Sequence, residues 1–222
     1  MPTAFIIGAS RGIGREFAQQ LLVDGWKVFA TARDDAGIAA LRTAGAEAIK
    51  LDVADTASIA SLAWQLEDVK LDLAVYMAGV FGSRQGADAA PTTDEFDRIM
   101  HTNVLGAMQL IPTVAPMVEA AGGKFIFMSS GMGSIGEADG SYGWLYRVSK
   151  AALDMAVKAA SFDYPNAALV AMSPGWVQTD MGGPGATITA QQSVAAMRRV
   201  IDTLTLKDTG SFRDYTGRDM PW

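Results

Sequence analysis

Apolar stretches of strand length alternate with segments of helical spacing along the whole chain, and this alternation most constrains the fold. In segment 15–25, for example, Phe17, Leu21 and Leu22 share one helical face, and Gly25 provides a stop. Near-continuous apolar strands between helices predict a parallel sheet covered on both sides. Right-handed crossovers then give a doubly wound α/β fold. Strands are expected at 3–9, 26–32, 47–53, 71–79, 123–130 and 167–175, and helices at 15–25, 35–44, 55–67, 93–120, 145–163 and 189–204.

The composition narrows the class of protein. Half of the 222 residues are hydrophobic and 19% are charged, which is typical of a folded globular chain. No apolar run approaches the roughly 20 residues of a membrane-spanning helix. Residues 1–10 lack a basic leader, so no signal peptide is expected. Because there is no internal repeat or linker, residues 1–222 are expected to form a single domain. The absence of cysteine excludes disulfides and thiolate chemistry, and the cytoplasm is the expected location.

Charge and histidine content argue against two further classes of function. The formal net charge is −6 without a basic cluster, whereas nucleic-acid binding depends on neutralising phosphates. We therefore expect no nucleic-acid partner, and no membrane partner either. His101 is the only histidine, which argues against a histidine-rich site, and we expect no metal ion. We interpret His101 as a helix residue whose ring is satisfied by a neighbour.

A glycine-rich turn, GASRGIG at 8–14, joins the first expected strand to the first helix. Its glycines permit a tight turn, close approach of the backbone to a pyrophosphate, and close helix packing. The helix that begins here offers unpaired N–H groups and a positive dipole end to an anion. The strand–turn–helix context predicts a dinucleotide site; a glycine-rich turn without a ligand is the alternative. The turn residues expected to bind are Gly8, Ser10, Arg11, Gly12, Ile13 and Gly14.

The end of the second expected strand indicates which nicotinamide dinucleotide would bind. NAD sites usually place an acid about 20 residues beyond the glycines, where it binds the ribose 2′-hydroxyl. Here the residue 19 positions beyond Gly14 is Arg33, whose guanidinium suits a 2′-phosphate. Arg11 is able to approach the same group from the glycine turn. The two cations favour NADP(H), while Asp34 and Asp35 keep open a contact with a ribose hydroxyl.

The order and spacing of further motifs resemble those of the short-chain dehydrogenase/reductase family along nearly the whole chain. The sequence is most similar to the compact branch that includes the C-factor and sniffer-type carbonyl reductases, on the evidence of "GWVQTDMGG" and the final "GSFRDYTGRDMPW". The resemblance implies a single-domain Rossmann-type fold that binds NADP(H). Outside the glycine turn, the residues that match the family's site are Asp52 and Val53, Ala78 and Gly79, Asn103, Ser130, Tyr146 and Lys150, and Pro174, Val177 and Thr179.

Two departures from the family pattern bear on the site. Met77 stands where the family usually has asparagine, and a thioether is only a weak hydrogen-bond acceptor. The local bonding there must therefore differ. Tyr146 follows Ser130 by 16 positions, slightly more than in many family members. This interval leaves Ser129 as an alternative to Ser130, although the run "SSGMG" favours the second serine.

The pair in "YRVSK" has the spacing of a proton donor and its tuning cation. Positions i and i+4 place Tyr146 and Lys150 on the same helical face. A phenol of ordinary pKa, about 10, exchanges protons readily near neutrality only if that pKa is lowered, and a nearby ammonium favours the phenolate. The resemblance further implies that Lys150 binds the nicotinamide ribose, Ser130 holds the substrate oxygen and Asn103 positions a water of a proton relay. Tyr142 is a second phenol, but it has no lysine four residues later.

These observations predict an NADPH-dependent reductase of a ketone or aldehyde, with the alcohol as product of a reversible reaction. The rival hypothesis is an NADP-binding regulatory or signalling protein of the C-factor type with little or no turnover. The pocket walls are expected to include Phe81, Met132, Trp144, Trp176 and Met181, which favours an apolar substrate, and segment 182–190 is expected to form a flexible lid. Segment 93–120 and the helix with Tyr146 match the family's usual pairing face, and a homodimer or homotetramer is compatible with them.

Overall fold

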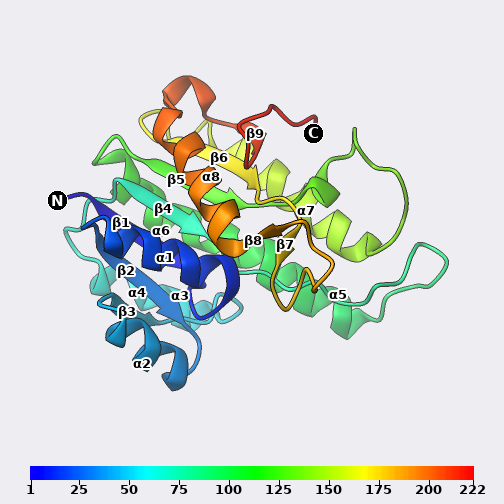
Figure 1. The fold of residues 1–222 in the computed structure, drawn as a ribbon, viewed down its shortest axis with the longest axis horizontal. Coiled ribbons are helices and arrows are strands. Elements are labelled where there is room, and N and C mark those ends of the chain that lie inside the picture. The colour runs from blue at the N-terminus through cyan, green and yellow to red at the C-terminus, as the bar shows by residue number, and fades with distance from the viewer.

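A seven-stranded parallel sheet forms the centre of the computed structural model, which describes residues 1–222 (Figure 1). Its strand order is β3-β2-β1-β4-β5-β6-β9, and each neighbouring pair is parallel. A separate two-stranded ribbon joins β7 to β8. The strands are β1 (Thr3–Ile7), β2 (Lys27–Ala32), β3 (Glu47–Lys50), β4 (Leu73–Tyr76), β5 (Lys124–Met128), β6 (Ala168–Ser173), β7 (Val177–Gln178), β8 (Ile188–Thr189) and β9 (Ser211–Asp214).

Helices connect the strands, and no helix is long and apolar enough to cross a membrane. Local side chains fix several helix starts: Asp34, Thr92 and Thr189 each accept a hydrogen bond from a backbone N–H of the first turn. The helices are α1 (Gly12–Val23), α2 (Asp35–Thr43), α3 (Thr56–Ala60), α4 (Leu62–Gln65), α5 (Thr93–Met100), α6 (Gly106–Glu119), α7 (Trp144–Ala160) and α8 (Ala190–Thr203), with a π-helical turn at His101–Leu105 and 3₁₀ turns at Gly131–Gly133 and Leu206–Asp208.

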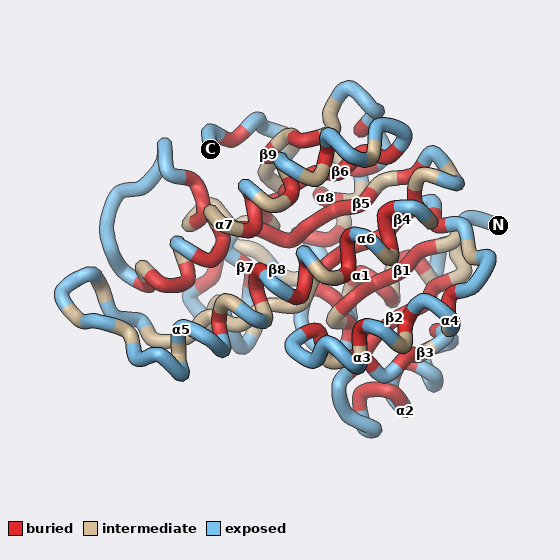
Figure 2. The backbone as a smooth tube through the Cα atoms, turned by 180° about the vertical axis from the view of Figure 1, so that it is seen from behind, coloured by how far each residue is buried: buried red, intermediate tan, exposed pale blue.

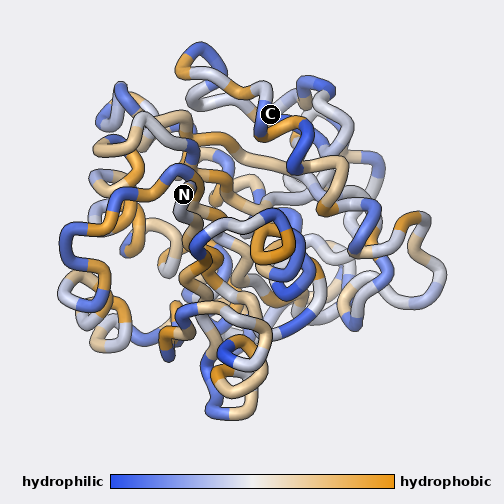
Figure 3. Tube along the Cα trace, turned by 60° about the vertical axis from the view of Figure 1, so that its left-hand side comes forward, coloured by the Kyte–Doolittle hydropathy of each residue, from blue (hydrophilic) through white to orange (hydrophobic).

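Alternate side chains of the strands enter two separate hydrophobic clusters, one on each face of the sheet. On β1, Phe5 and Ile7 join residues of α6 and α7, whereas Ala4 and Ile6 join residues of α1, α2 and α8. Buried segments therefore run along the strands and the inner sides of the helices (Figure 2). The hydropathy pattern agrees, since hydrophobic segments are frequent in the interior and hydrophilic ones at the outer turns (Figure 3). The five inner strands β1, β2, β4, β5 and β6 are thus buried from both sides, whereas the edge strands β3 and β9 are partly exposed.

The predicted doubly wound fold is confirmed, and six sheet strands lie within the predicted stretches. The structure adds β9, which pairs with β6 and was not predicted. Only Phe212 of its four residues is fully buried, so its sequence lacks the apolar run of the other strands. Segment 93–120 is not one α-helix, because the π-helical turn separates α5 from α6. Segment 55–67 likewise forms two short helices, α3 and α4.

The carboxyl ends of the strands point to the side of the molecule where the β7–β8 ribbon and α5 lie, at the right of Figure 1. The glycine turn 8–14, the loops after β4 and β5, and the segment after β6 all begin at this edge. Two long exposed loops, next to α5 and before α7, extend beside them (Figure 2). Ligands of open α/β sheets bind beyond the carboxyl ends of the strands, so this edge is where the predicted site residues converge.

Candidate active site

The glycine turn has the close packing that was predicted for a pyrophosphate-binding turn. Gly8 has φ +92°, and a Cβ atom there would lie 2.9 Å from the backbone nitrogen of Ala78. A Cβ atom at Gly14 would lie 2.2 Å from the carbonyl oxygen of Gly8. Only glycine permits α1 to begin this close to β1. Arg11, which precedes α1, gives no side-chain cap, so the first N–H groups of the helix have no side-chain partner at the cap position.

Thr31 contributes to the turn and was not predicted. Its hydroxyl accepts a hydrogen bond from the Gly8 N–H at 2.9 Å, and the Ala9 N–H donates to the Thr31 carbonyl at 2.8 Å. These bonds hold the first residues of the turn against β2. The signal in the sequence is a threonine within an otherwise apolar strand, since a buried hydroxyl requires a partner.

The acidic and basic side chains near the expected adenosine end differ in their partners. Asp34 caps α2 by accepting from the Gly37 N–H at 2.7 Å, and Asp35 forms an exposed ion pair with Lys50 at 2.8 Å. Both acids therefore have local partners. Arg33 is exposed and has no ion pair. Arg11 reaches across to Asp180 at 3.5 Å, an exposed pair of the kind that contributes about 0–1 kcal/mol.

The neighbouring strand ends bring the next predicted residues to the same edge. Val53 is buried, and the carboxylate of Asp52 accepts from the Ala54 N–H at 3.0 Å. Ala78 and Gly79 follow β4, and Gly79 has no side chain to separate the groups around it. A Cβ atom there would lie 3.5 Å from both Asn103 Oδ1 and Lys150 Nζ. Met77 packs against the cluster under α1 and α8.

Asn103 is completely buried in the π-helical turn and anchors the loop after β4. Its Oδ1 accepts from the Val80 N–H at 2.8 Å, and its Nδ2 donates to the Val80 carbonyl at 2.9 Å and to the Ser149 hydroxyl at 2.9 Å. Both N–H donors of the amide are thus used by the protein. In the same turn, the Thr102 carbonyl accepts a hydrogen bond from the Tyr76 phenol at 2.6 Å.

The two serines after β5 differ in their surroundings. Ser130 caps the following 3₁₀ turn by accepting from the Met132 N–H at 3.1 Å, and its hydrogen bond lowers the pKa of Tyr146. Ser129 is buried and faces Asp154 instead, and its hydroxyl lowers the pKa of that carboxyl. Ser130 is therefore the serine beside the predicted phenol, in agreement with the preference drawn from "SSGMG".

Tyr146 and Lys150 lie on the buried face of α7, as their spacing predicts. Burial raises the pKa of Tyr146 to about 12; the Ser130 hydrogen bond lowers it and the charge of Asp154 raises it. The expected lowering of this pKa is therefore contradicted by the structure, in which the effect of burial outweighs the Ser130 hydrogen bond. Burial also lowers the pKa of Lys150 to about 8, against the charge of Asp154. The Lys150 ammonium lies 5.6 Å from the Tyr146 ring centroid and donates to the Met128 carbonyl at 2.7 Å.

Phe81, one of the expected pocket walls, packs against Tyr146, and Met132 lies near Gly143 with it. The Phe81 ring stacks on the Tyr146 ring, with centroids 4.6 Å apart. Phe81 and Met132 also meet at Gly143, where a Cβ atom would lie 2.9 Å from the Phe81 ring and 3.1 Å from the Met132 methyl. The Phe81 ring therefore gives the phenol an apolar neighbour. Trp144 is partly buried at the start of α7.

The segment after β6 closes over the glycine turn. A Cβ atom at Gly12 would lie 3.4 Å from the Thr179 methyl. Pro174 accepts a hydrogen bond from Ser193 at 2.6 Å, and Val177 is buried in β7. Trp176 and Met181 are both exposed here, by 56% and 40%.

The expected lid, 182–190, is joined to this segment by hydrogen bonds. The Trp176 indole donates to the Gly182 carbonyl at 2.9 Å, Gln178 donates to Ala186 at 3.0 Å, and β8 pairs with β7. Its role as a flexible lid stays a prediction.

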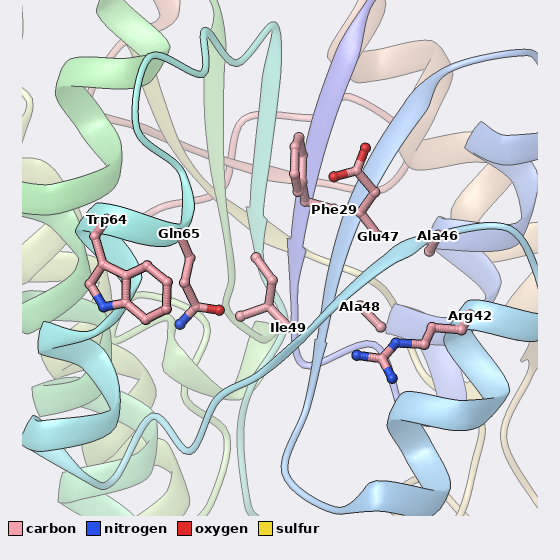
Figure 4. A pocket seen from close by; sticks show the side chains of 8 residues that line it. All are labelled: Phe29, Arg42, Ala46, Glu47, Ala48, Ile49, Trp64 and Gln65. Atoms are coloured by element: carbon pink, nitrogen blue, oxygen red, sulfur yellow. The ribbon is translucent and has the colours of Figure 1, made fainter.

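His101 is not one of the residues of this site. It is exposed, and its Nδ1 lies 2.6 Å from the Asp97 carbonyl one turn earlier, which agrees with its interpretation as a helix residue satisfied by a neighbour. A shallow groove lies along the edge strand β3, between Trp64 and Arg42 (Figure 4). None of the predicted site residues lines it. The residues that line the groove are Phe29, Arg42, Ala46, Glu47, Ala48, Ile49, Trp64 and Gln65.

Known proteins share both this sequence pattern and this architecture. The family model described as short chain dehydrogenase matches residues 2–187, so the chain belongs to the short-chain dehydrogenase/reductase family of oxidoreductases. The C-signal protein of Myxococcus xanthus is 41% identical over 128 residues, which cover 56% of this chain and 77% of that protein.

Solved structures of three proteins superpose along the whole chain. A short-chain dehydrogenase/reductase from Burkholderia multivorans with bound NADP has a TM-score of 0.89 and 32% identity, covering 100% of this chain and 99% of that one. The NADPH-bound carbonyl reductase from chicken fatty liver has a TM-score of 0.88 and 31% identity, with the same coverage. The carbonyl reductase Sniffer of D. melanogaster has a TM-score of 0.89 and 27% identity, covering 100% of both chains. The resemblance to the C-factor and sniffer branch is thereby confirmed.

Proposed function

We propose that this chain is an NADPH-dependent oxidoreductase that reduces a ketone or aldehyde to an alcohol, and that the reaction is reversible. The observation that carries the proposal is the convergence of a buried phenol, a buried ammonium and a serine hydroxyl at the strand edge that also holds the glycine turn. A protein that only binds a nucleotide has no need of a phenol beside a polar hydroxyl. The relatives that carry bound NADP or NADPH support the choice of cofactor.

The residues around the glycine turn fit NADPH better than NADH. The turn 8–14 would hold the pyrophosphate, and Arg33, with Arg11 released from its exposed pair with Asp180, would hold the 2′-phosphate. The competing acids support this choice, because Asp34 is the cap of α2 and Asp35 pairs with Lys50. Asp52 and Val53 would lie beside the adenine, and Ala78, Gly79, Pro174, Val177 and Thr179 along the rest of the dinucleotide. When bound, NADPH supplies the hydride.

The protein would supply the proton and the stabilisation of developing charge. Tyr146 donates the proton of its hydroxyl to the substrate oxygen as that oxygen becomes an alkoxide. A phenol with a raised pKa keeps its proton through the neutral range, which suits the reductive direction. Ser130 donates a hydrogen bond to the same oxygen and so stabilises the charge that forms there. Lys150 binds the nicotinamide ribose and favours the phenolate that is left after proton transfer.

The proton lost from Tyr146 must be replaced from solvent. We assign to Asn103 the positioning of a relay water near Lys150, because Asn103 Oδ1 and Lys150 Nζ both approach Gly79. The N–H donors of the Asn103 amide already bind Val80 and Ser149. The water would therefore be held by an acceptor of Asn103, its main-chain or side-chain carbonyl oxygen. The apolar neighbours Phe81 and Met132 favour a substrate with an apolar body.

The direct test is Tyr146→Phe, which removes the hydroxyl and keeps the ring that stacks on Phe81. Carbonyl reduction should fall by about 10² to 10⁴-fold, the range of a lost general acid, while NADPH affinity measured by fluorescence stays within about twofold, since the ring remains. Tyr142→Phe is the matched control, because Tyr142 is half exposed and also near Phe81. Full turnover by Tyr146→Phe would exclude this mechanism.

The similarity to the C-signal protein favours a second candidate, an NADP-binding signalling protein with little or no turnover. Met77, in place of the family asparagine, is compatible with it. The two functions are separated by titrating NADPH and then screening carbonyl compounds at saturating NADPH. Tight binding without turnover across a broad panel supports the signalling protein, and turnover that depends on Tyr146 supports the reductase.

A further inference from the structure

A third buried polar side chain continues the face of α7 that carries the candidate proton donor. Tyr146, Lys150 and Asp154 are spaced i, i+4 and i+8, and their exposed fractions are 7%, 4% and 3%. This spacing stacks them along one side of the helix. The proposed mechanism uses the first two and leaves the carboxyl group without a role. A carboxyl group buried this deeply is costly unless it has a partner.

The surroundings of Asp154 offer few hydrogen bonds. Neither carboxylate oxygen has a well-formed hydrogen bond, and the facing Ser129 hydroxyl is equally without one. The loop after β5 packs closely against the Asp154 carboxyl group. A Cβ atom at Gly133 would lie 3.0 Å from Asp154 Oδ2 and 2.9 Å from Lys150 Cβ. The glycine therefore lets this loop seal the carboxyl group and the lysine stem into the same compartment.

Electrostatic interactions couple Asp154 to Lys150 and Tyr146 on α7. Burial raises the pKa of Asp154 to about 7, whereas Ser129 and the charge of Lys150 lower it. The charge of Asp154 in turn raises the pKa of Lys150 and the pKa of Tyr146. The segment from β5 to the 3₁₀ turn contributes only the uncharged Ser129 and Gly133. Lys150 is thus the one charged group that faces the carboxyl group and changes its ionisation.

We propose that Asp154 is a positioning residue of the active site, the buried counter-charge that keeps Lys150 an ammonium and opposes ionisation of the Tyr146 phenol. Its importance for the reaction rests on the proposed function, but the coupling between the three groups does not. Asp154 acts through Lys150 and Tyr146 and touches neither substrate nor cofactor. Its negative charge keeps both protons in place, so the phenol stays a donor and the ammonium stays charged over a wider range of pH.

Removal of the Asp154 charge should change the titration of Lys150 and of Tyr146 in the same direction. Without Asp154, Lys150 and Tyr146 both lose their protons at lower pH, because a neighbouring anion favours the protonated form of each. Loss of either proton ends the reduction, so both effects move the alkaline limb of its pH profile the same way. A residue that only filled space would change the rate or the stability, but it would not move this limb.

The test compares Asp154→Asn and Asp154→Ala, which remove the same charge and differ in shape, with Asp163→Asn, an exposed control just beyond α7. The kcat for carbonyl reduction is measured against pH. Both Asp154 variants should shift the alkaline limb to lower pH by on the order of one unit, the size expected of a charge at close range. The Asp163 variant should superpose on the wild type. Profiles that superpose for all variants, or a shift in only one Asp154 variant, would overturn the proposal.

A second readout needs no turnover. Lysine labelled with ¹³C at Cε is followed by NMR, and the Lys150 resonance is assigned by its absence from Lys150→Met. In the wild type this resonance should respond to two ionisations, its own and that of Asp154, and in the Asp154 variants to one, at lower pH. If no carbonyl compound is reduced but this titration moves, the proposed function fails and the coupling stands. If reduction proceeds and the titration is unchanged, the coupling is wrong and the proposed function stands.

Discussion

At the scale of single residues, the buried amide of Asn103 is the clearest case of a side chain fixed by hydrogen bonds. Its three bonds join the π-helical turn to Val80 and to Ser149 on α7. An unpaired buried polar group costs about 1–3 kcal/mol. Asn103→Ala leaves the peptide groups of Val80 and the Ser149 hydroxyl without these partners.

The expected result for Asn103→Ala is a loss of about 2 to 4 kcal/mol in the free energy of unfolding, measured by urea titration. Asn166→Ala is the matched control, because Asn166 is exposed and its side chain makes no hydrogen bond. That control should stay within about 0.5 kcal/mol of the wild type. Equal stability of the two variants would mean that the three bonds contribute nothing.

Arg33 gives a second prediction at this scale, about the choice of cofactor. Hydrogen bonds to a charged group contribute about 1.5–3 kcal/mol, so Arg33→Ala should raise the KM for NADPH on the order of tenfold to a hundredfold. The KM for NADH should change by less than about twofold, since NADH has no 2′-phosphate. Arg15→Ala, an exposed arginine on α1, is the control. Steady-state kinetics with both cofactors checks this, and equal effects on the two would refute the assignment.

Individual site residues were predictable where they belong to a recognisable motif. They were not predictable where only their burial in the structure indicates a role. The spacing of Tyr146 and Lys150 and the preference for Ser130 agree with the geometry around the phenol. Asp154 was missed because an aspartate within an amphipathic helix is usually solvated. Its position four residues after Lys150, on the face of Leu153 and Val157, was the available signal.

At the scale of elements, the start of α1 depends on the contact between Gly14 and the Gly8 carbonyl. A Cβ atom at position 14 would lie 2.2 Å from that oxygen, so Gly14→Ala must displace the helix from β1. We expect a loss of about 1–3 kcal/mol in stability, and at least about tenfold weaker NADPH binding as the N–H groups move. Gly140→Ala, where a Cβ atom meets nothing within 4 Å, is the control. Calorimetry of folding and binding checks both, and unchanged NADPH affinity in Gly14→Ala would contradict the assigned pyrophosphate site.

Elements were predictable where periodicity is strong and the element is buried. Strands β1 to β6 follow apolar runs, whereas β9 contributes one buried phenylalanine and depends on pairing with β6. The π-helical turn between α5 and α6 has no period that distinguishes it from an α-helix, although it places Asn103 against Val80. Both β9 and the π-helical turn depend on tertiary contacts, which cannot be read from a pattern along the chain.

At the scale of the whole molecule, the buried pair on α7 should make stability depend on pH. The native pKa of Asp154 is raised from 3.8 to about 7, so the folded chain holds this proton more tightly and stability falls as pH rises through that window. The native pKa of Lys150 is lowered from 10.5 to about 8, so the unfolded chain binds more protons above pH 8 and stability rises there. The contribution of the pair is therefore least favourable between about pH 7 and 8.

The measurement is the free energy of unfolding of the wild type and of Asp154→Asn/Lys150→Met at several pH values. The double variant should gain most, relative to the wild type, between about pH 7 and 8, and less at either side. A difference that does not change with pH would show that neither group titrates differently in the folded chain.

The central claim is that the molecule reduces carbonyl compounds with NADPH through Tyr146, and one kinetic comparison tests it most directly. NADPH and NADH are compared as cofactors across a panel of ketones and aldehydes, with the wild type and Tyr146→Phe. We predict turnover of at least one carbonyl compound, a higher kcat/KM with NADPH than with NADH, and its loss in Tyr146→Phe. NADPH binding without turnover of any compound, or turnover that Tyr146→Phe retains, would contradict the claim.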